Sequence, residues 1–170
     1  MKKLEIFFDY HCPYCFKGHE QLRDFLRQNP EVAVEWRPCE IFRLPGNTVS
    51  PKHIDLCLQG MFFVVEIAGD LESYHDKVYD LLFNKNVKVD GVDAFVGEFE
   101  GFFSEAELSA FRQALKDNKY RKNLDEANNF AFRENVVHVV PTYRADDGFL
   151  QDRQEFFNMG ATSTGYGGAG

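Results

Sequence analysis

A long run of helical patterns separates two groups of strand patterns, and this arrangement constrains the fold more than any other feature of the sequence. Leu4 to Phe8 and Val32 to Trp36 alternate apolar and polar side chains like half-buried strands. Between them, apolar residues recur at three- and four-residue steps from Cys15 towards Asn29, as in an amphipathic helix. A strand, a helix and a strand in this order predict a parallel pair with a right-handed crossover. The chain is therefore expected to be an α/β protein that opens with a βαβ unit.

Helix start signals recur through residues 47–135, where no strand pattern is visible. The expected N-terminal residues of these helices are Ser50 before Pro51, Asp70, Asp90, and Ser104 with Glu107 in capping-box spacing; a last helix carries Leu124, Ala127 and Ala131. The aromatic residues of this region are expected to form its core rather than a substrate cleft: Phe62, Phe63, Tyr74, Phe95, Phe99 and Phe111.

Strand patterns return after residue 135. Val136 to Tyr143 is β-branched but contains Pro141, which predicts an edge strand or a special turn. Asp147-Gly148 predicts a hairpin turn, with Phe149 to Phe157 as the return strand. Residues 159–170 are rich in glycine and are predicted to be a flexible tail.

Two cysteines stand where the first strand turns into the first helix, in the segment Cys12-Pro13-Tyr14-Cys15. A thiol reacts as a nucleophile only in its thiolate form, and the free N–H groups and dipole of a helix N-terminus favour that form at Cys12. Cys15 lies one turn further along the helix and is expected to be more buried. This placement predicts a redox pair in which Cys12 forms a mixed disulfide and Cys15 resolves it.

A metal site is the main alternative at this spacing, because zinc sites also use pairs of cysteines two residues apart. The remaining ligands would have to come from His11, Cys39, His53 and Cys57, of which the last two are four residues apart on one predicted helix. The βαβ context favours redox chemistry, and we predict no bound metal.

The segment from Phe8 to Gly18 resembles the active-site stretch of the DsbA family of thiol-disulfide oxidoreductases, and more closely its cytosolic FrnE-like branch. Residues 36–41, Glu126-Ala127 and residues 139–143 are also similar to segments of that branch. The resemblance covers about residues 3–158. It implies a thioredoxin-like fold built from 1–46 and 136–158, with an all-helical domain, 47–135, inserted between the second strand and the cis-proline strand.

The same resemblance implies a cis peptide bond between Val140 and Pro141, which sets the backbone of Val140 beside Cys12. Pro13, Tyr14, Val140 and Pro141 are accordingly expected to bind the substrate. The family's last helix should follow Gly160-Ala161, where this chain is glycine-rich, so that helix is expected to be missing or shortened. A homodimer that covers the incomplete face is one way to compensate.

Two other groups of enzymes share features with this sequence. Glutaredoxins carry the same Pro-Tyr dipeptide but are too short for the helices of 47–135. Kappa-class glutathione transferases and hydroxychromene carboxylate isomerases share the inserted architecture but use serine where Cys12 stands. A glutathione-dependent transferase or isomerase is therefore the second enzymatic hypothesis, and a zinc-binding or chaperone-like module is the non-enzymatic one.

Three further residues are candidate modulators of the pair. His11 adds a positive charge beside Cys12 when protonated. Asp9 is expected either to influence proton movement to Cys15 or, with greater weight, to cap the turn. By the same resemblance, Cys39 lies near the active-site end of the second strand. It is expected to be either a third redox thiol or a small buried apolar side chain.

The charge of the chain limits its partners. With 27 acidic and 19 basic residues the formal net charge is -8, which repels phosphate backbones and anionic membranes. The N-terminus lacks a long apolar run, so we predict a cytoplasmic protein without a membrane partner. The expected partners are thiols or disulfides of proteins or small molecules. No cofactor is expected beyond the Cys12–Cys15 disulfide, although glutathione is a candidate co-substrate.

Overall fold

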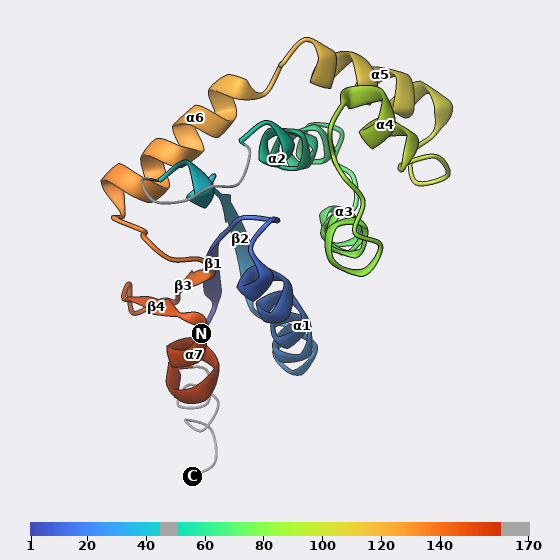
Figure 1. Ribbon diagram of the computed structural model, residues 1–170. Coiled ribbons are helices and arrows are strands. Elements are labelled where there is room, and N and C mark those ends of the chain that lie inside the picture. The colour runs from blue at the N-terminus through green and yellow to red at the C-terminus, as the bar shows by residue number, and fades with distance from the viewer. Residues whose placement is uncertain (45–50, 161–170) are drawn as a thin grey trace.

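A mixed four-stranded sheet forms one end of the molecule, and most of the helices gather at the other (Figure 1). The computed structural model describes residues 1–44 and 51–160, except for the side chains of 51–55, 159 and 160. The strands are β1 (Lys3–Phe8), β2 (Ala33–Pro38), β3 (Thr142–Arg144) and β4 (Leu150–Asp152). Their order is β2-β1-β3-β4, with β1 and β2 parallel and the other neighbours antiparallel. The predicted βαβ opening is therefore confirmed.

Helix α1 (Pro13–Gln28) connects the two parallel strands and covers one face of the sheet. Pro13 occupies the first turn, where a missing N–H costs nothing, and Cys12 is the N-cap. At the other end the Asn29 side chain donates to the carbonyl of Phe25 (2.9 Å), directly before Pro30. The helix therefore ends where the sequence predicted.

Five helices and three shorter helical turns lie between β2 and β3 in the described residues. They are η1 (Ile41–Arg43), α2 (Pro51–Glu66), α3 (Leu71–Tyr79), η2 (Asp80–Asn84), α4 (Val92–Gly97), α5 (Glu105–Lys116), α6 (Arg121–Asn129) and η3 (Phe130–Glu134). In Figure 1 the helices α2 to α6 arch over the end of the sheet at which β1 leads into α1. This is the thioredoxin fold with a helical insertion that the sequence predicted.

Local signals placed most of these helix starts correctly. Asp70 accepts from the backbone N–H of Ser73 (3.0 Å), and Ser104 and Glu107 form the predicted capping box. The predicted cap at Asp90 is wrong, because α4 begins one residue later, with Gly91 in an extended conformation as its N-cap.

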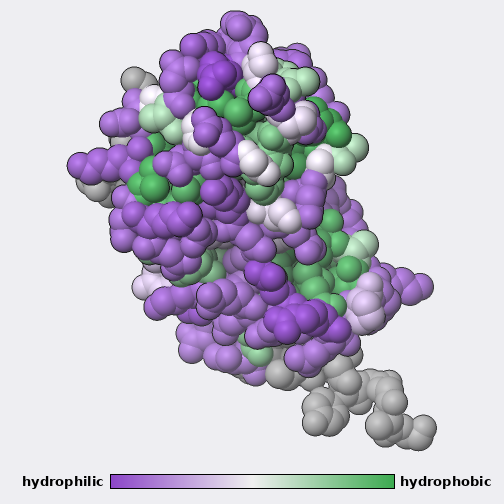
Figure 2. Space-filling model, turned by 90° about the vertical axis from the view of Figure 1, so that its right-hand side faces the viewer, coloured by the Kyte–Doolittle hydropathy of each residue, from purple (hydrophilic) through white to green (hydrophobic). Residues whose placement is uncertain are grey.

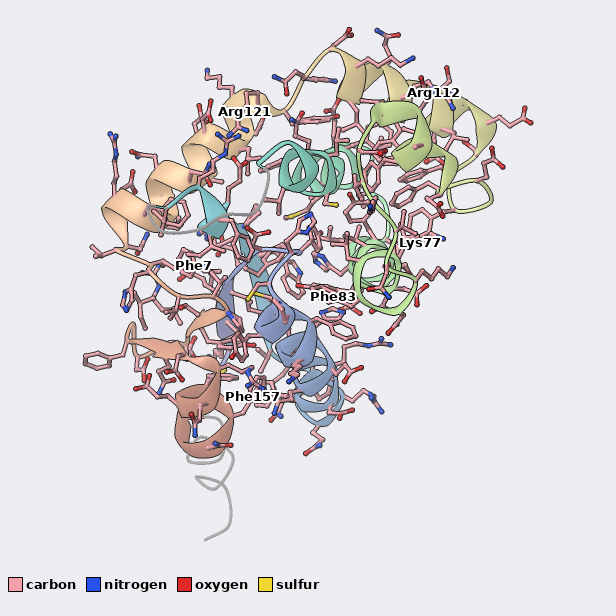
Figure 3. The ribbon with its side chains drawn as sticks, in the orientation of Figure 1. Phe7, Lys77, Phe83, Arg112, Arg121 and Phe157 are labelled. Atoms are coloured by element: carbon pink, nitrogen blue, oxygen red, sulfur yellow. The ribbon has the colours of Figure 1, made fainter. Side chains whose placement is uncertain are left out.

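The aromatic side chains of the insertion form a core, as predicted. Phe63, Phe99 and Phe111 are buried, with ring centroids 5.0 Å apart for Phe63 and Phe111 and 5.3 Å apart for Phe99 and Phe111. Phe83 lies between α3 and α1 (Figure 3) and stacks on Phe16 of α1 at 4.9 Å. The insertion therefore packs against the helix that carries the two cysteines.

The C-terminal segment departs from the prediction. β3 begins only at Thr142, after Pro141, and it lies inside the sheet rather than at its edge. The hairpin turn at Asp147-Gly148 is confirmed by the positive φ of Gly148 (79°). The return strand is shorter than predicted, because Asp152 ends it and caps a helix.

This last helix consists of α7 (Arg153–Glu155) and the π-helical turn η4 (Phe156–Gly160), which includes two residues of the predicted tail. It begins at Arg153 rather than after Gly160, because Asp152 and Glu155 form a capping box. Phe156 is fully buried and stacks on Tyr143 of β3 at 4.7 Å. Within the described residues, this helix covers the sheet. The rest of the predicted tail, 161–170, and the predicted boundary at 46 and 47 lie outside the described residues.

The other face of the sheet carries an ion-pair ladder. Glu5 of β1 accepts hydrogen bonds from Arg37 of β2 (3.0 Å) and from Arg144 of β3 (2.6 Å). The hydrogen bonds from these guanidinium groups lower the pKa of Glu5. At this position the sheet presents paired charges rather than an apolar surface, and the homodimer stays a prediction.

Most of the surface shown in Figure 2 is hydrophilic, with smaller hydrophobic areas between the polar side chains. No helix in the described part of the chain combines the length and the apolar character that crossing a membrane requires.

Candidate active site

The two cysteines of the site lie at the point where β1 turns into α1. The backbone N–H of Cys12 donates to the carbonyl of Asp9 (3.1 Å), which closes the turn, and the carbonyl of Cys12 accepts the first hydrogen bond of the helix, from Phe16 (3.1 Å). As the N-cap, Cys12 stands outside the helix, whereas Cys15 points into the protein from the first turn. Their exposed fractions are 6% and 3%.

The loop before β3 meets Cys12 from the other side. The peptide bond between Val140 and Pro141 is cis, and the thiol of Cys12 donates to the carbonyl of Val140 at 3.4 Å. The hydroxyl of Thr142 holds this loop by donating to the carbonyl of Val139 (2.7 Å). The structure thus brings together Cys12, Val140 and Pro141, which the sequence placed at one site.

Gly18 permits this close approach of α1 to the loop. A Cβ atom at this position would lie 2.7 Å from the hydroxyl of Tyr143 and 3.2 Å from Pro141 Cγ. Both distances are shorter than ordinary van der Waals contact, so a larger residue would push the helix and the loop apart. The sequence alone predicts no role for this glycine.

The two thiols differ in acidity. The pKa of Cys12 is lowered to about 7, mainly because the Cys15 thiol donates a hydrogen bond to the thiolate; the backbone N–H groups of Cys15 and Tyr14 and the positive charge of Arg153 add to this effect. Burial raises the pKa of Cys15 well above the ordinary value, and the thiolate of Cys12 raises it further. At pH 7 about half of Cys12 is therefore thiolate, whereas Cys15 remains protonated.

Asp9 is fully buried beside the pair, where it joins two loops. One carboxylate oxygen accepts from the backbone N–H of His11 (3.2 Å) and the other from that of Ile41 (3.0 Å). Burial raises the pKa of Asp9 well above the ordinary value. These contacts support the turn-capping interpretation of Asp9. Its effect on Cys15, and that of the His11 side chain on Cys12, stay predictions.

Glu40, next to this loop, ties the insertion to the site. Its buried carboxylate accepts hydrogen bonds from Arg121 (2.5 Å) and Asn128 (2.9 Å) on α6, and the Asn128 side-chain oxygen accepts from the backbone N–H of Glu40 (2.8 Å). Figure 3 shows Arg121 on α6. Because Ile41 follows Glu40 and contacts Asp9, α6 is linked to the turn that holds Cys12.

The two other cysteines are fully buried. The thiol of Cys39 donates to the carbonyl of Phe8 (3.7 Å), and burial raises the pKa values of both Cys39 and Cys57. Within residues 1–44 and 51–160, no three His, Cys, Asp or Glu side chains converge in a geometry suited to a metal ion. The side chain of His53, one candidate ligand, lies outside the described residues.

Arg153 is the site residue that the sequence analysis missed. It is the first residue of α7, and its guanidinium lies near enough to Cys12 to lower the pKa of that thiol. It borders a groove of about 230 Å³ together with Tyr14, Val139, Val140, Pro141, Asp152 and Gln154. The sequence signal that could have found it is the capping-box spacing of Asp152 and Glu155, which predicts a helix start here.

A strand-helix-strand unit with a two-cysteine helix start, a cis-proline loop beside it and an inserted helical layer defines a thioredoxin-fold protein of the DsbA type. The family model described as "DSBA-like thioredoxin domain" matches residues 3–162, and the chain belongs to this family. The predicted resemblance to the DsbA family is thereby confirmed.

Individual relatives are distant in sequence. An uncharacterized protein of Bacillus subtilis, YwbO, is 21% identical to this chain, in a match that covers 85% of this chain and 86% of that protein. The structure of a 2-hydroxychromene-2-carboxylate isomerase is similar with a TM-score of 0.73, at 15% identity over 95% of this chain and 94% of the isomerase. The cytosolic disulfide reductase DsbM from Pseudomonas aeruginosa, solved with GSH, is similar with a TM-score of 0.68, at 9% identity over 92% of this chain and 93% of DsbM. At these identities the structural matches establish the fold alone.

Proposed function

We propose that this protein is a dithiol-disulfide oxidoreductase in which Cys12 is the nucleophile and Cys15 the resolving thiol. The observation that carries the proposal is the asymmetry of the two thiols: the pKa of Cys12 is about 7, whereas burial holds Cys15 protonated. A thiol with a pKa near ambient pH is the best attacking group in disulfide exchange.

The reaction proceeds in two exchanges. The Cys12 thiolate attacks one sulfur of a substrate disulfide, the substrate S–S bond breaks, and one substrate thiolate leaves. Cys15 then loses its proton and attacks Cys12 Sγ, which releases the second substrate thiolate and forms the Cys12–Cys15 disulfide. The substrate gains two electrons and the protein loses two; with a dithiol substrate the same steps run in reverse.

The loop at Val140 supports a role in binding the substrate. Its carbonyl already accepts a hydrogen bond from the Cys12 thiol at 3.4 Å, so a group bound to Cys12 Sγ would lie against this backbone. Tyr14 (58% exposed) and Val139 (47% exposed) border the adjoining groove and are free to contact such a group. We propose that Pro13, Tyr14, Val140 and Pro141 form the surface that a substrate contacts.

Trapping of the mixed disulfide tests the proposal. The reduced protein is mixed with a peptide disulfide, quenched with acid and analysed by mass spectrometry. Cys15→Ser should accumulate a covalent adduct at Cys12, Cys12→Ser should form none, and the native protein should pass through the adduct to the internal disulfide. Cys57→Ala, which removes a buried thiol in the insertion, is the matched control and should behave like the native protein.

Turnover of a disulfide substrate with glutathione as reductant separates this proposal from its enzymatic alternative. Loss of turnover in Cys15→Ser supports the two-thiol cycle. Undiminished turnover in Cys15→Ser would contradict it and favour glutathione-dependent chemistry that needs only one reactive group at position 12.

A further inference from the structure

The groove bordered by Val140, whose carbonyl accepts the hydrogen bond of the Cys12 thiol, has an apolar side and a cationic side. Val139, Val140 and Pro141 of the loop before β3 provide the apolar side, and Arg153 provides a positive charge. Its volume of about 230 Å³ lies below the range of about 300–1,000 Å³ that is typical for sites that enclose a whole drug-sized ligand. The groove therefore suits the part of a substrate that lies next to the reacting sulfur.

Neutral groups hold Arg153 in place. Its Nη1 donates to the side-chain oxygen of Gln21 (3.1 Å), and its guanidinium carbon lies 5.7 Å from the centre of the Tyr14 ring. Its Cδ would be 3.2 Å from a Cβ atom at Gly18, so the aliphatic part packs along α1. No carboxylate in the described part of the chain forms an ion pair with Arg153, so its charge is available to a ligand.

The acidic residues nearest to Arg153 in sequence are already engaged. Asp152 also borders the groove, but its carboxylate accepts a hydrogen bond from the backbone N–H of Glu155 (2.8 Å). In return, the carboxylate of Glu155 accepts a hydrogen bond from the backbone N–H of Asp152 (3.1 Å). Negative charge at this position is stabilised by the first turn of the helix. Arg153 therefore supplies a positive charge that borders the groove and acts on Cys12, in a protein whose formal net charge is -8.

We propose that Arg153 selects disulfides that carry a carboxylate close to the reacting sulfur. The inference rests on the proposed function of Cys12. As the Cys12 thiolate attacks and the substrate S–S bond breaks, the guanidinium pairs with the carboxylate of the substrate and holds the sulfur in the groove. Such a carboxylate can belong to a small disulfide, such as oxidised glutathione, or to an acidic residue beside a cystine of a protein.

Three small symmetric disulfides of different charge test the selectivity. They are 3,3'-dithiodipropionate, which is anionic, bis(2-hydroxyethyl) disulfide, which is neutral, and cystamine, which is cationic. Second-order rate constants for the reduced full-length protein are measured by acid quenching and mass spectrometry at low ionic strength. An exposed ion pair changes a rate by a factor of about 1.4–5. Because Arg153 attracts the anion and repels the cation, this factor enters the ratio of the two rates twice, and the native ratio should exceed that of Arg153→Gln by about two- to twenty-fivefold.

Matched variants separate charge from structure. Arg153→Lys keeps the charge and should retain most of the ratio. Arg112→Gln removes an arginine of α5 that pairs with Asp93 (3.1 Å) and lies at the opposite end of the molecule from α7 (Figure 3), so its ratio should equal that of the native protein. The difference between the ratios of the native protein and of Arg153→Gln should also shrink when salt is raised to about 0.5 M, because salt screens the charge of Arg153.

An equal ratio in Arg153→Gln and in the native protein, or a difference between their ratios that salt does not change, would overturn the inference. If Arg153→Gln does not fold, Arg153→Met replaces it as the uncharged variant. A native protein that does not react with the neutral disulfide refutes the proposed function of Cys12 instead, so the two failures are distinguishable. Dependence on Arg153 with oxidised glutathione supports the small-molecule source, and dependence with a disulfide-linked acidic peptide supports the protein source.

Discussion

Replacing Cys15 with alanine should make Cys12 a weaker acid. The hydrogen bond from the Cys15 thiol is the largest cause of the lowered pKa of Cys12, which lies at about 7. A hydrogen bond to a charged group contributes about 1.5–3 kcal/mol, and each factor of ten in acidity corresponds to about 1.36 kcal/mol. Without this donor the midpoint of Cys12 ionisation should move to about pH 8–9.

The assay is the rate of alkylation of Cys12 by iodoacetamide as a function of pH, with the modified residue identified by mass spectrometry. At pH 7 a thiol with a pKa of about 7 is about half ionised, against roughly 3% for an ordinary cysteine. A thiolate of lower pKa is intrinsically less reactive, by about fivefold for this difference, so the net advantage at pH 7 is only about threefold. The midpoint of the pH profile is therefore the decisive quantity, not the absolute rate.

Cys15→Ser is the matched control for this experiment, because its hydroxyl keeps a hydrogen-bond donor in the same place. Its midpoint should lie closer to that of the native protein than the midpoint of Cys15→Ala does. Identical midpoints for the native protein and Cys15→Ala would refute the assigned cause of the low pKa. A native midpoint at pH 8.5 or above, the value of about 8.5 for an ordinary thiol, would refute the low pKa itself.

Four further results are expected. Because folding lowers the pKa of Cys12, the reduced native protein should gain up to about 2 kcal/mol of stability relative to Cys12→Ser as the pH rises from about 7 to about 8.5, and lose it again as the pH falls; denaturant titrations at several pH values measure this. Gly18→Ala should lower the free energy of unfolding by about 1–2 kcal/mol because of overpacking, whereas Gly97→Ala, with open space around its Cβ, should not; equal effects would contradict the steric argument. Phe156→Ala should cost about 3–5 kcal/mol in urea unfolding, since the ring is fully buried, and a loss below about 1 kcal/mol would mean that the last helix does not cover the sheet. Cys39→Ala should retain disulfide turnover within about twofold, because burial keeps that thiol protonated, and a loss of turnover would assign Cys39 a redox role.

Features that depend on neighbours in sequence were predictable. The start of α1 at Pro13, its end before Pro30 and the caps at Asp70 and Ser104 all follow from side chains within a few residues of the backbone groups that they satisfy. The same logic applied to Asp152 and Glu155 predicts α7, but the hairpin signal at Asp147-Gly148 predicts a return strand over the same residues. The return strand was therefore predicted to be longer than β4 is.

Features that depend on packing were not predictable from the residues alone. Nothing near Glu5 in sequence indicates that Arg37 and Arg144 neutralise it from the two neighbouring strands. The interior position of β3 is likewise a property of the sheet order. Such contacts join residues that are far apart along the chain, and charge patterns do not identify the partners.

The sequence by itself determined that Cys12 and Cys15 stand at a helix start. Cys12 comes just before the helix and Cys15 lies in its first turn, because both positions follow from the spacing within a single helical turn. The tertiary structure alone decided how the pair is surrounded: Val140 and Arg153 approach Cys12 from the C-terminal part of the chain, and Asp9 and Glu40 link it to the insertion. The acidity of a thiol depends on charges and donors within a few ångströms, and folding alone sets which groups lie at that distance.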